Sequence, residues 1–366
     1  MSKFKVIQLL PELNIGGVER GTKDFSKVLV ERGHDSLVIS NGGIFEKDII
    51  EDGGKHINLP IHKKSLFSIR YASDLRDIYL SEKPDIVHVR SRMPAWINYF
   101  AYKKLSHKPL LVSTFHGLYS TPLYSQVMSK VDHIIAISKT VKDYIQGTYK
   151  VPNEKITVIP RGCDPEIFNK NPVEESWIKK WYEEFPQTQD KIILTMPTRI
   201  SKWKGVDSFI DLVSLLDDDN YHALIVGPTA KSKKSYLKQL QNKISNYGIE
   251  DKITITGSRN DISNIYKISD FVFNLSIKPE PFGRTTIEAI SSGSKVIGWN
   301  HGGTKEILEE LYPDGLVELD NIEDLAEKVI NLSNMTNSMP KENTFTSERM
   351  TNQTISLYQD LLAKRL

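Results

Sequence analysis

Short apolar runs alternate with amphipathic segments along most of this 366-residue chain. The short runs are rich in β-branched residues and predict buried strands, whereas segments with apolar residues three or four positions apart predict helices. The predicted strands of the first half are 6–10, 36–40, 85–89, 110–114, 133–138 and 156–160, and those of the second half are 192–197, 222–226, 253–256, 271–275 and 295–298. Strands that alternate with helices in this way predict an α/β fold with parallel sheets.

The two series of strands predict two domains, because one hydrophobic core rarely serves a chain of this length. The segment 164–190 contains three prolines and no strand-like run, so it predicts a linker, although its tryptophans favour a packed helix within it. We therefore predict an N-terminal Rossmann-like domain over 1–172 and a C-terminal one over 173–346. The last segment, 347–366, has apolar residues at helical spacing and predicts a terminal helix that packs back on the first domain.

The composition is that of a globular protein, with 39% hydrophobic and 26% charged residues. A single cysteine, Cys163, excludes a disulfide framework and is typical of a reducing compartment. We find no signal peptide and no run of roughly 18 apolar residues that would span a membrane. The sequence therefore predicts a cytoplasmic protein.

Positive charge is concentrated in one stretch, although the net charge of the whole chain is only +2. Between residues 61 and 110 there are ten Lys or Arg residues against four acidic residues. The low net charge argues against a nucleic-acid partner. The basic stretch indicates an acidic acceptor or peripheral contact with an anionic membrane, and an ordinary solvated surface is an equally good interpretation.

The loop after the first predicted strand carries Gly16 and Gly17 and opens a helix. Paired glycines allow a backbone to approach a phosphate or sugar closely, and a helix N-terminus offers free N–H groups. The spacing to Gly21 does not match G-x-G-x-x-G, and the second strand is followed by 40–43 without an acidic residue for an NAD ribose. These features count against a dehydrogenase, and a tight turn that binds no ligand remains an alternative.

Two later loops carry charged candidates for a phosphate site. Arg199 and Lys204, with Lys202 as a further candidate, follow the strand 192–197, where cations can neutralise a diphosphate leaving group. A solvent-facing basic loop is the alternative.

The loop after the strand 271–275 carries Glu280, Phe282 and Gly283, and Glu288 follows in the helix. The N–H groups of Phe282 and Gly283 can hold a phosphate or sugar, and Glu288 can accept hydrogen bonds from ribose hydroxyls. A pair of carboxylates also suits hydrolysis of a glycosidic bond, and the sequence does not give their separation.

Together these motifs resemble the family 4 retaining glycosyltransferases, which have the GT-B fold. This resemblance implies two Rossmann-like domains with parallel sheets that face an interdomain cleft. The matching motifs span nearly the whole chain in the order of that family. They are Gly16-Gly17, Arg199 with Lys204-Gly205, Glu280 and Glu288 as the E-x7-E signature, and the segments 131–138, 158–164 and 302–306.

The resemblance also implies roles for single residues. Arg199 and Lys204 would bind the donor diphosphate, and Glu288 the ribose hydroxyls. Glu280, with the backbone of Phe282 and Gly283, would face the transferred sugar.

Further roles concern the base and the reaction centre. His116 matches the histidine of the N-terminal domain at the reaction centre, with a buried structural histidine as the alternative. Gly257, Ser258 and Arg259 match the backbone contacts to the nucleotide base. Arg161 departs from the pattern, because many relatives have Asn there, and the extra cation puts donor or acceptor preference in doubt.

The resemblance predicts transfer from a UDP-sugar to a lipopolysaccharide or other surface glycan, with a lipid-linked acceptor at the inner face of the cytoplasmic membrane. A GDP-mannose donor, a nonhydrolysing nucleotide-sugar epimerase and a non-catalytic nucleotide-sugar-binding module are the alternatives. We expect no cofactor and no metal, because Arg199 and Lys204 would replace the ion. Asp217, Asp218 and Asp219 are interpreted as a solvated helix end.

Overall fold

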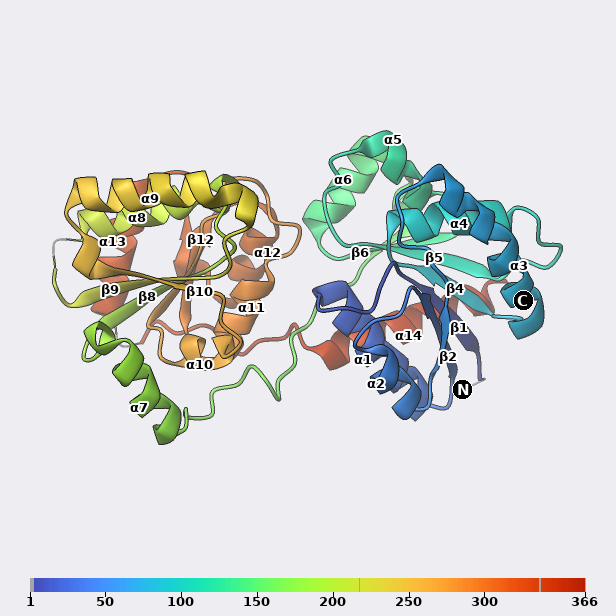
Figure 1. Cartoon of the computed structure of the whole chain (residues 1–366), viewed down its shortest axis with the longest axis horizontal. Helices are drawn as coiled ribbons and strands as arrows, with labels where there is room; N and C mark the ends of the chain where they lie inside the picture. Colours follow the sequence, from blue (N-terminus) through green and yellow to red (C-terminus); the bar gives the residue numbers. More distant parts are fainter. Residues whose placement is uncertain (1–2, 217, 336, 366) are drawn as a thin grey trace. The chain divides into compact units, whose positions relative to one another are not determined.

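Buried β-branched and aromatic residues build two parallel sheets in the computed structural model, which describes residues 3–216, 218–335 and 337–365 (Figure 1). One sheet has seven strands and the other has six, and helices cover their faces. The predicted α/β fold class is therefore confirmed. The chain divides into two compact units, Met1–Pro160 with Met350–Leu366 and Arg161–Arg349.

The sheet of the first unit has the strand order β3-β2-β1-β4-β5-β6-β7, and all its neighbouring strands are parallel. Its strands are β1 Lys5–Leu9, β2 Asp35–Ser40, β3 Lys55–Asn58, β4 Ile86–Val89, β5 Leu110–Phe115, β6 His133–Ala136 and β7 Ile156–Val158. Its helices are α1 Gly17–Glu31, α2 Glu46–Glu51, α3 Tyr71–Glu82, α4 Arg92–Tyr102, α5 Pro122–Ser125, α6 Lys139–Tyr149 and α14 Ser347–Ala363. Three 3-10 helices, η1 Leu66–Arg70, η2 Gln126–Ser129 and η3 Asn153–Lys155, complete the unit.

The sheet of the second unit has the strand order β10-β9-β8-β11-β12-β13 and is also parallel. Its strands are β8 Ile192–Pro197, β9 Tyr221–Val226, β10 Ile253–Gly257, β11 Phe271–Asn274, β12 Lys295–Trp299 and β13 Leu316–Val317. Its helices are α7 Glu175–Glu184, α8 Val206–Leu215, α9 Lys234–Tyr247, α10 Ile262–Lys267, α11 Arg284–Ser291, α12 Gly302–Leu311 and α13 Ile322–Ser333. Its 3-10 helices are η4 Pro186–Thr188, η5 Lys202–Lys204, η6 Lys231–Lys233, η7 Glu250–Lys252 and η8 Pro313–Gly315.

Each sheet contains one point at which the direction of strand addition reverses. In the first unit the chain adds β2 and β3 on one side of β1 and then returns to add β4 on the other side. In the second unit the same reversal occurs between β8 and β11. The helices on the two sides of a reversal cover opposite faces of the sheet, which leaves a crevice beyond the carboxyl ends of the two strands. This topology decides where a ligand site is expected in each unit.

The unit boundaries differ from the predicted ones. The sequence placed the division at 172/173 and 346/347, whereas the compact units divide at 160/161 and 349/350. The two crossing segments pair with each other, because the N–H of Cys163 donates to Phe345 O at 3.0 Å and the N–H of Ser347 donates to Cys163 O at 3.0 Å. This pairing fastens the segment after Pro160 to the second unit.

The predicted linker 164–190 belongs to the second unit rather than joining two domains loosely. Within it, α7 buries Trp181 against Ile193 and Leu224 of the sheet, as its tryptophans indicated. The Trp177 and Trp181 rings stack with their centroids 5.2 Å apart. Burial of these large aromatic surfaces explains why the segment is ordered despite its polar composition.

Two strands were missed by the sequence analysis. β3 is an edge strand with a mixed polar sequence and no buried residue, and β13 has only two residues. Neither has the apolar run that identified the other strands. Across the described residues, no helix has the length and apolar character needed to cross a membrane.

The C-terminal helix α14 packs on the first unit beside α1. Its residues Ile355 and Tyr358 are buried in one hydrophobic cluster with Phe25 of α1 and with side chains of the sheet. The Tyr358 ring makes edge contacts with Phe4 and Phe25, and its hydroxyl is hydrogen-bonded to Nδ1 of His88. The last turns of the chain are therefore part of the core that the first 160 residues build.

We predict that Tyr358→Ala destabilises the first unit by about 3–5 kcal/mol, because it deletes a fully buried aromatic side chain and leaves a cavity. Ser356→Ala, on the exposed face of the same helix, is the control and should change stability by less than about 0.5 kcal/mol. Native-state hydrogen exchange of the β1 and β4 amides in urea measures both. Equal effects of the two substitutions would show that α14 is not part of this core.

Candidate active site

The loops after β8 and β11 flank the strand reversal of the second unit. Open parallel sheets bind ligands beyond the carboxyl ends of their strands at such a point. Arg199 and Lys204 lie in the loop after β8, and Glu280 and Phe282 lie in the loop after β11. The structure therefore brings two of the predicted loops together, so that Lys204 contacts Glu280, 76 residues later in the sequence.

Lys204 and Glu280 form an ion pair between these loops. The Glu280 carboxylate also accepts a hydrogen bond of 2.6 Å from Ser276 Oγ. Lys204 Nζ lies 4.2 Å from the centroid of the Trp203 ring, which adds a cation–π contact. Only 19% of the Lys204 side chain and 12% of the Glu280 side chain are exposed, so solvent screens the pair weakly. A positive charge is thus held in place at the strand reversal.

Close contact between the two loops fixes the position of this pair. Gly205 has φ +76°, and a Cβ atom there would lie 1.8 Å from Leu275 O, so only glycine fits. Beside it, the N–H of Ile277 donates to Trp203 O at 2.9 Å. The backbones of the two loops therefore touch directly, which limits how far Lys204 and Glu280 can move apart.

The N-terminus of α12 supports the Glu280 loop from the other side. The N–H of Gly303 donates to Glu280 O at 2.7 Å, and a Cβ atom on Gly303 would lie 2.4 Å from Phe282 Cα. His301 donates from Nε2 to Ser276 O at 2.6 Å. Because backbone and imidazole hold both ends of this loop, the Glu280 carboxylate is positioned before any ligand arrives.

Helix α11 begins at the end of the same loop. Gly283, with φ +100°, precedes its first residue and provides no side-chain cap, while the N–H of Thr286 donates to Gly283 O at 3.1 Å. The positive end of the helix dipole therefore lies at this loop. This arrangement is suited to an anion. Glu288 is only 7% exposed, and its carboxylate accepts a hydrogen bond of 2.8 Å from Arg284. A nearly buried carboxylate thus follows a predicted phosphate site within two turns of helix.

The remaining predicted residues of this unit differ in their surroundings. Arg199 is exposed and makes no ion pair with the residues that the structure describes. Gly257 ends β10, and its carbonyl accepts a hydrogen bond of 2.8 Å from the N–H of Gly227. Ser258 follows and is exposed.

The guanidinium of Arg259 makes bidentate contacts with Glu184 at 2.9 and 3.0 Å and with Asp261 at 3.0 and 2.8 Å. These two carboxylates raise its pKa, with the hydrogen bond to Asp261 as the largest cause. The Arg259 side chain therefore fastens α7 to the loop after β10. Only its backbone is available for the predicted contact with a base.

Cys163, the single cysteine, lies near the Glu288 region but is not a candidate nucleophile. It is 6% exposed, and its sulfur contacts Ser291 Oγ and Asn343 Nδ2, each at 3.1 Å. Burial raises the pKa of its thiol, and the negative charge of Glu288 adds to the shift. The thiol is therefore protonated at neutral pH, and a thiol is a far weaker nucleophile than a thiolate.

The other predicted residues belong to the first unit. Gly16 immediately precedes α1, and Gly17 is the first residue of that helix. His116 directly follows β5, and its N–H donates to the Tyr119 hydroxyl at a long 3.4 Å. All three residues therefore lie at the carboxyl edge of their own sheet, where the topology favours a ligand.

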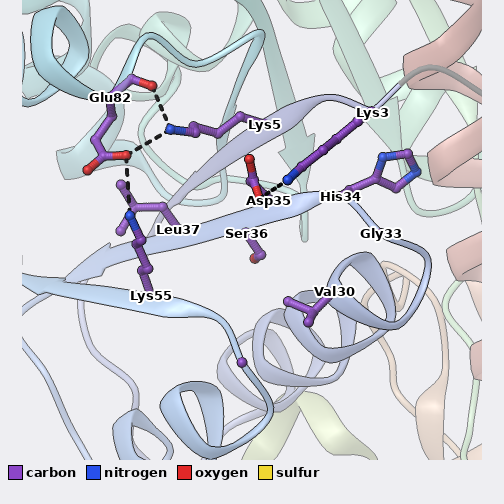
Figure 2. A pocket seen from close by; sticks show the side chains of 11 residues that line it. Lys3, Lys5, Val30, Gly33, His34, Asp35, Ser36, Leu37, Lys55 and Glu82 are labelled. Atoms are coloured by element: carbon purple, nitrogen blue, oxygen red, sulfur yellow. Dashed lines mark hydrogen bonds and ion pairs between the residues drawn. The ribbon is translucent and has the colours of Figure 1, made fainter.

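A cavity of about 300 Å³ in the first unit lies at the opposite edge of that sheet (Figure 2). It is lined by Lys3, Lys5 and Asp35 around the amino-terminal ends of β1 and β2. Lys3 pairs with Asp35 at 2.8 Å, and Lys5 pairs with Glu82 at 3.0 Å. Since it is far from the carboxyl ends and its charges are already paired, we assign it no ligand.

The metal prediction is not tested by the structure. In the described part of the chain, no group of three or more His, Cys, Asp and Glu side chains has an arrangement that holds a metal ion. The sequence predicted a solvated helix end at residues 217–219, of which Asp217 lies outside the described residues. The Asp219 side chain is 93% exposed and lies 3.2 Å from Lys252 Nζ.

Sequence reasoning missed the residues that position Lys204 and Glu280. Trp203, Ser276 and His301 contact the pair or its loops, yet none of them was chosen as a candidate. Trp203 lies between the candidate lysines Lys202 and Lys204, and His301 directly precedes the glycines of the motif 302–306. Ser276 and His301 come from the loops after β11 and β12, and only the strand order shows that these loops adjoin. The position of Ser276 just after a predicted strand was the one available signal.

Comparisons with known proteins agree with this geometry. Residues 15–167 match the family model described as Glycosyltransferase Family 4, and residues 178–348 match Glycosyl transferases group 1. The crystal structure of a glycosyltransferase from Rickettsia africae ESF-5 is similar over 99% of both chains, with 31% identity and a TM-score of 0.86. The structure of Anabaena Alr3699/HepE in complex with UDP and glucose is similar over 98% of this chain and 100% of that one, with a TM-score of 0.77. Because the two sequences are only 20% identical, this similarity shows the fold alone.

One subunit of the human phosphatidylinositol N-acetylglucosaminyltransferase is 25% identical over 81% of this chain, which spans 62% of the length of that relative. The two family models, the strand orders of the two sheets and the similarity to the Rickettsia enzyme agree with one another. The chain belongs to the family 4 glycosyltransferases with the GT-B fold of two Rossmann-like units.

Proposed function

We propose that this glycosyltransferase moves a sugar from a nucleoside-diphosphate donor to a glycan acceptor with retention of the anomeric configuration. The observation that carries the proposal is the Lys204–Glu280 pair, held at the strand reversal beside the N-terminus of α11. A cation and a helix N-terminus at this point suit a diphosphate, and the adjacent carboxylate suits sugar hydroxyls.

The proposed chemistry needs stabilisation of the leaving group. As the bond between the anomeric carbon and the diphosphate oxygen breaks, negative charge grows on the diphosphate. Lys204, the first turn of α11 and the exposed Arg199 neutralise this charge. The acceptor hydroxyl attacks from the same face, and its proton passes to an oxygen of the leaving phosphate. Atoms and charge balance without a covalent intermediate on the protein.

The remaining roles follow the positions of the side chains. Glu288 accepts hydrogen bonds from the ribose hydroxyls, and the backbone of Gly257 to Arg259 contacts the base. The backbone of Phe282 and Gly283 holds the phosphate or the transferred sugar with Glu280. In the first unit, His116, Gly16 and Gly17 serve the reaction centre and the donor.

UDP is the proposed nucleotide, with GDP of a mannosyl donor as the alternative. The Anabaena structure, which contains UDP and glucose, supports UDP through likeness of fold. We propose a lipopolysaccharide or other surface glycan as acceptor, met at the cytoplasmic face of a membrane. The exposed lysines Lys63, Lys64, Lys103 and Lys104 and the 82% exposed Phe67 support contact with an anionic surface.

The function is tested by incubating the protein with UDP-glucose, UDP-N-acetylglucosamine or GDP-mannose, with and without an extract of lipid-linked glycans. We expect nucleotide release that depends on the acceptor, and an NMR spectrum of the product with the anomeric configuration of the donor. Inversion of that configuration would refute the retaining mechanism. Conversion of a donor to its epimer without acceptor would identify an epimerase instead.

We predict that Lys204→Ala lowers kcat by about a hundredfold or more, because it removes charge stabilisation made mainly in the transition state. Steady-state kinetics of nucleotide release measure the effect. Lys238→Ala is the matched control, since Lys238 is exposed on α9 of the same unit and has no role in the proposed site. A change in KM alone at position 204 would contradict the role given to Lys204.

We predict that Glu288→Ala weakens nucleotide binding about tenfold to a hundredfold, because a carboxylate that accepts two ribose hydrogen bonds is lost. The preferred base is first found by thermal shift with UDP, GDP and ADP, since a ligand that binds only the folded state raises Tm. Calorimetric titration then compares the variant with Glu309→Ala on the exposed side of α12. Unchanged affinity of the Glu288 variant would remove the ribose role.

We predict that the activity survives EDTA, because Lys204, Arg199 and the α11 N-terminus supply the positive charge that a divalent ion supplies in other phosphoryl sites. Initial rates before and after dialysis against EDTA give the measurement. Complete loss of activity that magnesium or manganese restores would overturn metal independence while leaving the transferase proposal intact.

A further inference from the structure

The strand reversal of the first unit carries two arginines. It lies between β1 and β4, where Arg90 directly follows β4 and Arg92 is the first residue of α4. The loop after β1 leads to Gly16 at the start of α1, so a glycine loop and two arginines lie at this reversal. The reversal of the second unit is flanked by loops with charged residues in the same way. The topological rule therefore indicates a ligand here as well, and the arginines indicate its charge.

Arg90 is a buried cation whose hydrogen-bond partner is a neutral side chain. It is 7% exposed, its Nε donates to Gln8 Oε1 at 2.9 Å, and its guanidinium lies 5.6 Å from the centroid of the Phe25 ring. No carboxylate of the described residues forms an ion pair with it. Burial lowers its pKa to about 10, so it remains charged at neutral pH. A buried charge without a counter-ion is costly, which favours an anion at this edge.

Arg92 is held in one position by two aromatic rings. Its guanidinium lies 4.9 Å from the centroid of Tyr119 and 5.4 Å from that of Tyr124. Its NH1 group donates to Thr121 Oγ1 at 3.1 Å and to Ser125 Oγ at 3.4 Å, both neutral hydroxyls. It too lacks an ion pair within the described ranges. An arginine fixed in this way loses little conformational entropy when it binds a carboxylate or phosphate bidentately.

The opposite edge of the same sheet shows that this lack of carboxylates is local. There, Lys3 pairs with Asp35, and Lys5 and Lys55 share Glu82 at 3.0 and 3.9 Å (Figure 2). Three cations at the amino-terminal edge therefore have carboxylate partners within the fold, whereas the two arginines after β4 have none in the described parts of the chain. The two edges of this sheet therefore differ in whether their positive charges have carboxylate partners among the described residues.

The Tyr119 ring connects Arg92 with the proposed reaction centre. Its hydroxyl accepts the hydrogen bond from the N–H of His116, while its face covers the Arg92 guanidinium. The Tyr119 carbonyl also accepts a hydrogen bond of 2.7 Å from Tyr144, which fixes this loop. An anionic group bound by Arg92 would therefore lie beside the loop that carries His116.

We propose that Arg92, supported by the buried positive charge of Arg90, binds a phosphate or carboxylate group of the acceptor. The site selects acceptors that carry such a group near the hydroxyl to be glycosylated. This inference rests on the proposed function, because it assigns the acceptor to the first unit. It adds a specificity-determining residue that no motif of the sequence indicated.

A purely structural role for Arg92 makes a different prediction. Its hydrogen bonds to Thr121 and Ser125 fasten the loop after β5 to the start of α4. If fastening were its only role, Thr121→Val would have the same effect as Arg92→Gln. If the guanidinium binds an anion, Thr121→Val keeps that anion site, because the two tyrosine rings still hold the guanidinium.

The test is calorimetric titration of the whole protein, saturated with the nucleotide that raises its Tm most so that the donor site is filled. The probes are glucose 6-phosphate, glucuronate and methyl glucoside, which carry a phosphate, a carboxylate and no charge. We expect at least one anionic probe to bind the native protein and methyl glucoside to bind at least tenfold more weakly. The anion that binds better identifies the group on the acceptor.

Arg92→Gln should weaken binding of that anion at least tenfold. Arg92→Lys keeps the positive charge but loses the two parallel hydrogen bonds of the guanidinium, so it should have a smaller effect. Thr121→Val should bind it as the native protein does. Lys103→Gln, the same charge change at the other end of α4, is the matched control and should have no effect. If Arg92→Gln does not fold, the comparison of Arg92→Lys with Thr121→Val carries the test.

The inference is overturned if the native protein binds no anionic probe, or if the Arg92 variants bind it unchanged while the nucleotide still binds. It is also overturned if Thr121→Val loses the anion as fully as Arg92→Gln. Failure of UDP, GDP and ADP to bind the native protein would instead count against the proposed function, so the two failures are distinguishable.

Discussion

The ion pair between Lys204 and Glu280 depends on the strand order of a parallel sheet, and the proposed chemistry depends on that pair. The strands β8 and β11 are neighbours in the sheet, although 73 residues separate the end of β8 from the start of β11, so the loops that follow them meet. A lysine on one loop then finds a carboxylate on the other in a weakly screened place. Without the reversal, the same residues would lie in a solvent-facing basic loop and a distant acidic loop.

Glycines make this meeting of loops possible. Gly205 allows the loop after β8 to touch Leu275, and Gly303 allows the start of α12 to touch Phe282. In both places the atom that a Cβ would meet belongs to the backbone, which cannot move aside as a flexible side chain can. Backbone contacts therefore fix the positions of the two loops, and through them the positions of the charged side chains of Lys204 and Glu280.

The first unit repeats this design with a different distribution of charge. Its reversal also joins a glycine loop with a cationic loop, but Arg90 and Arg92 meet neutral and aromatic side chains where Lys204 meets Glu280. Where a carboxylate of the protein neutralises the cation, the site is electrically balanced before a ligand binds. A buried cation that has no carboxylate partner is stabilised more strongly by an anionic ligand. The two units of one fold can thus present different chemistry at equivalent positions of their sheets.

The sequence by itself determined the elements and the chemistry available at their ends. Apolar runs such as 192–197 identified most strands, and the spacing of Glu280 and Glu288 indicated the loop that the structure places beside Lys204. It did not determine β3, which has no buried residue, or the boundary near Pro160, which depends on the pairing of Cys163 with Phe345 and Ser347, distant residues of the sequence. Only the tertiary structure decided that Lys204 meets Glu280, that Arg259 is occupied by Glu184 and Asp261, and that Arg92 lies between two tyrosines. These outcomes depend on strand order and on contacts between distant residues, which local periodicity does not record.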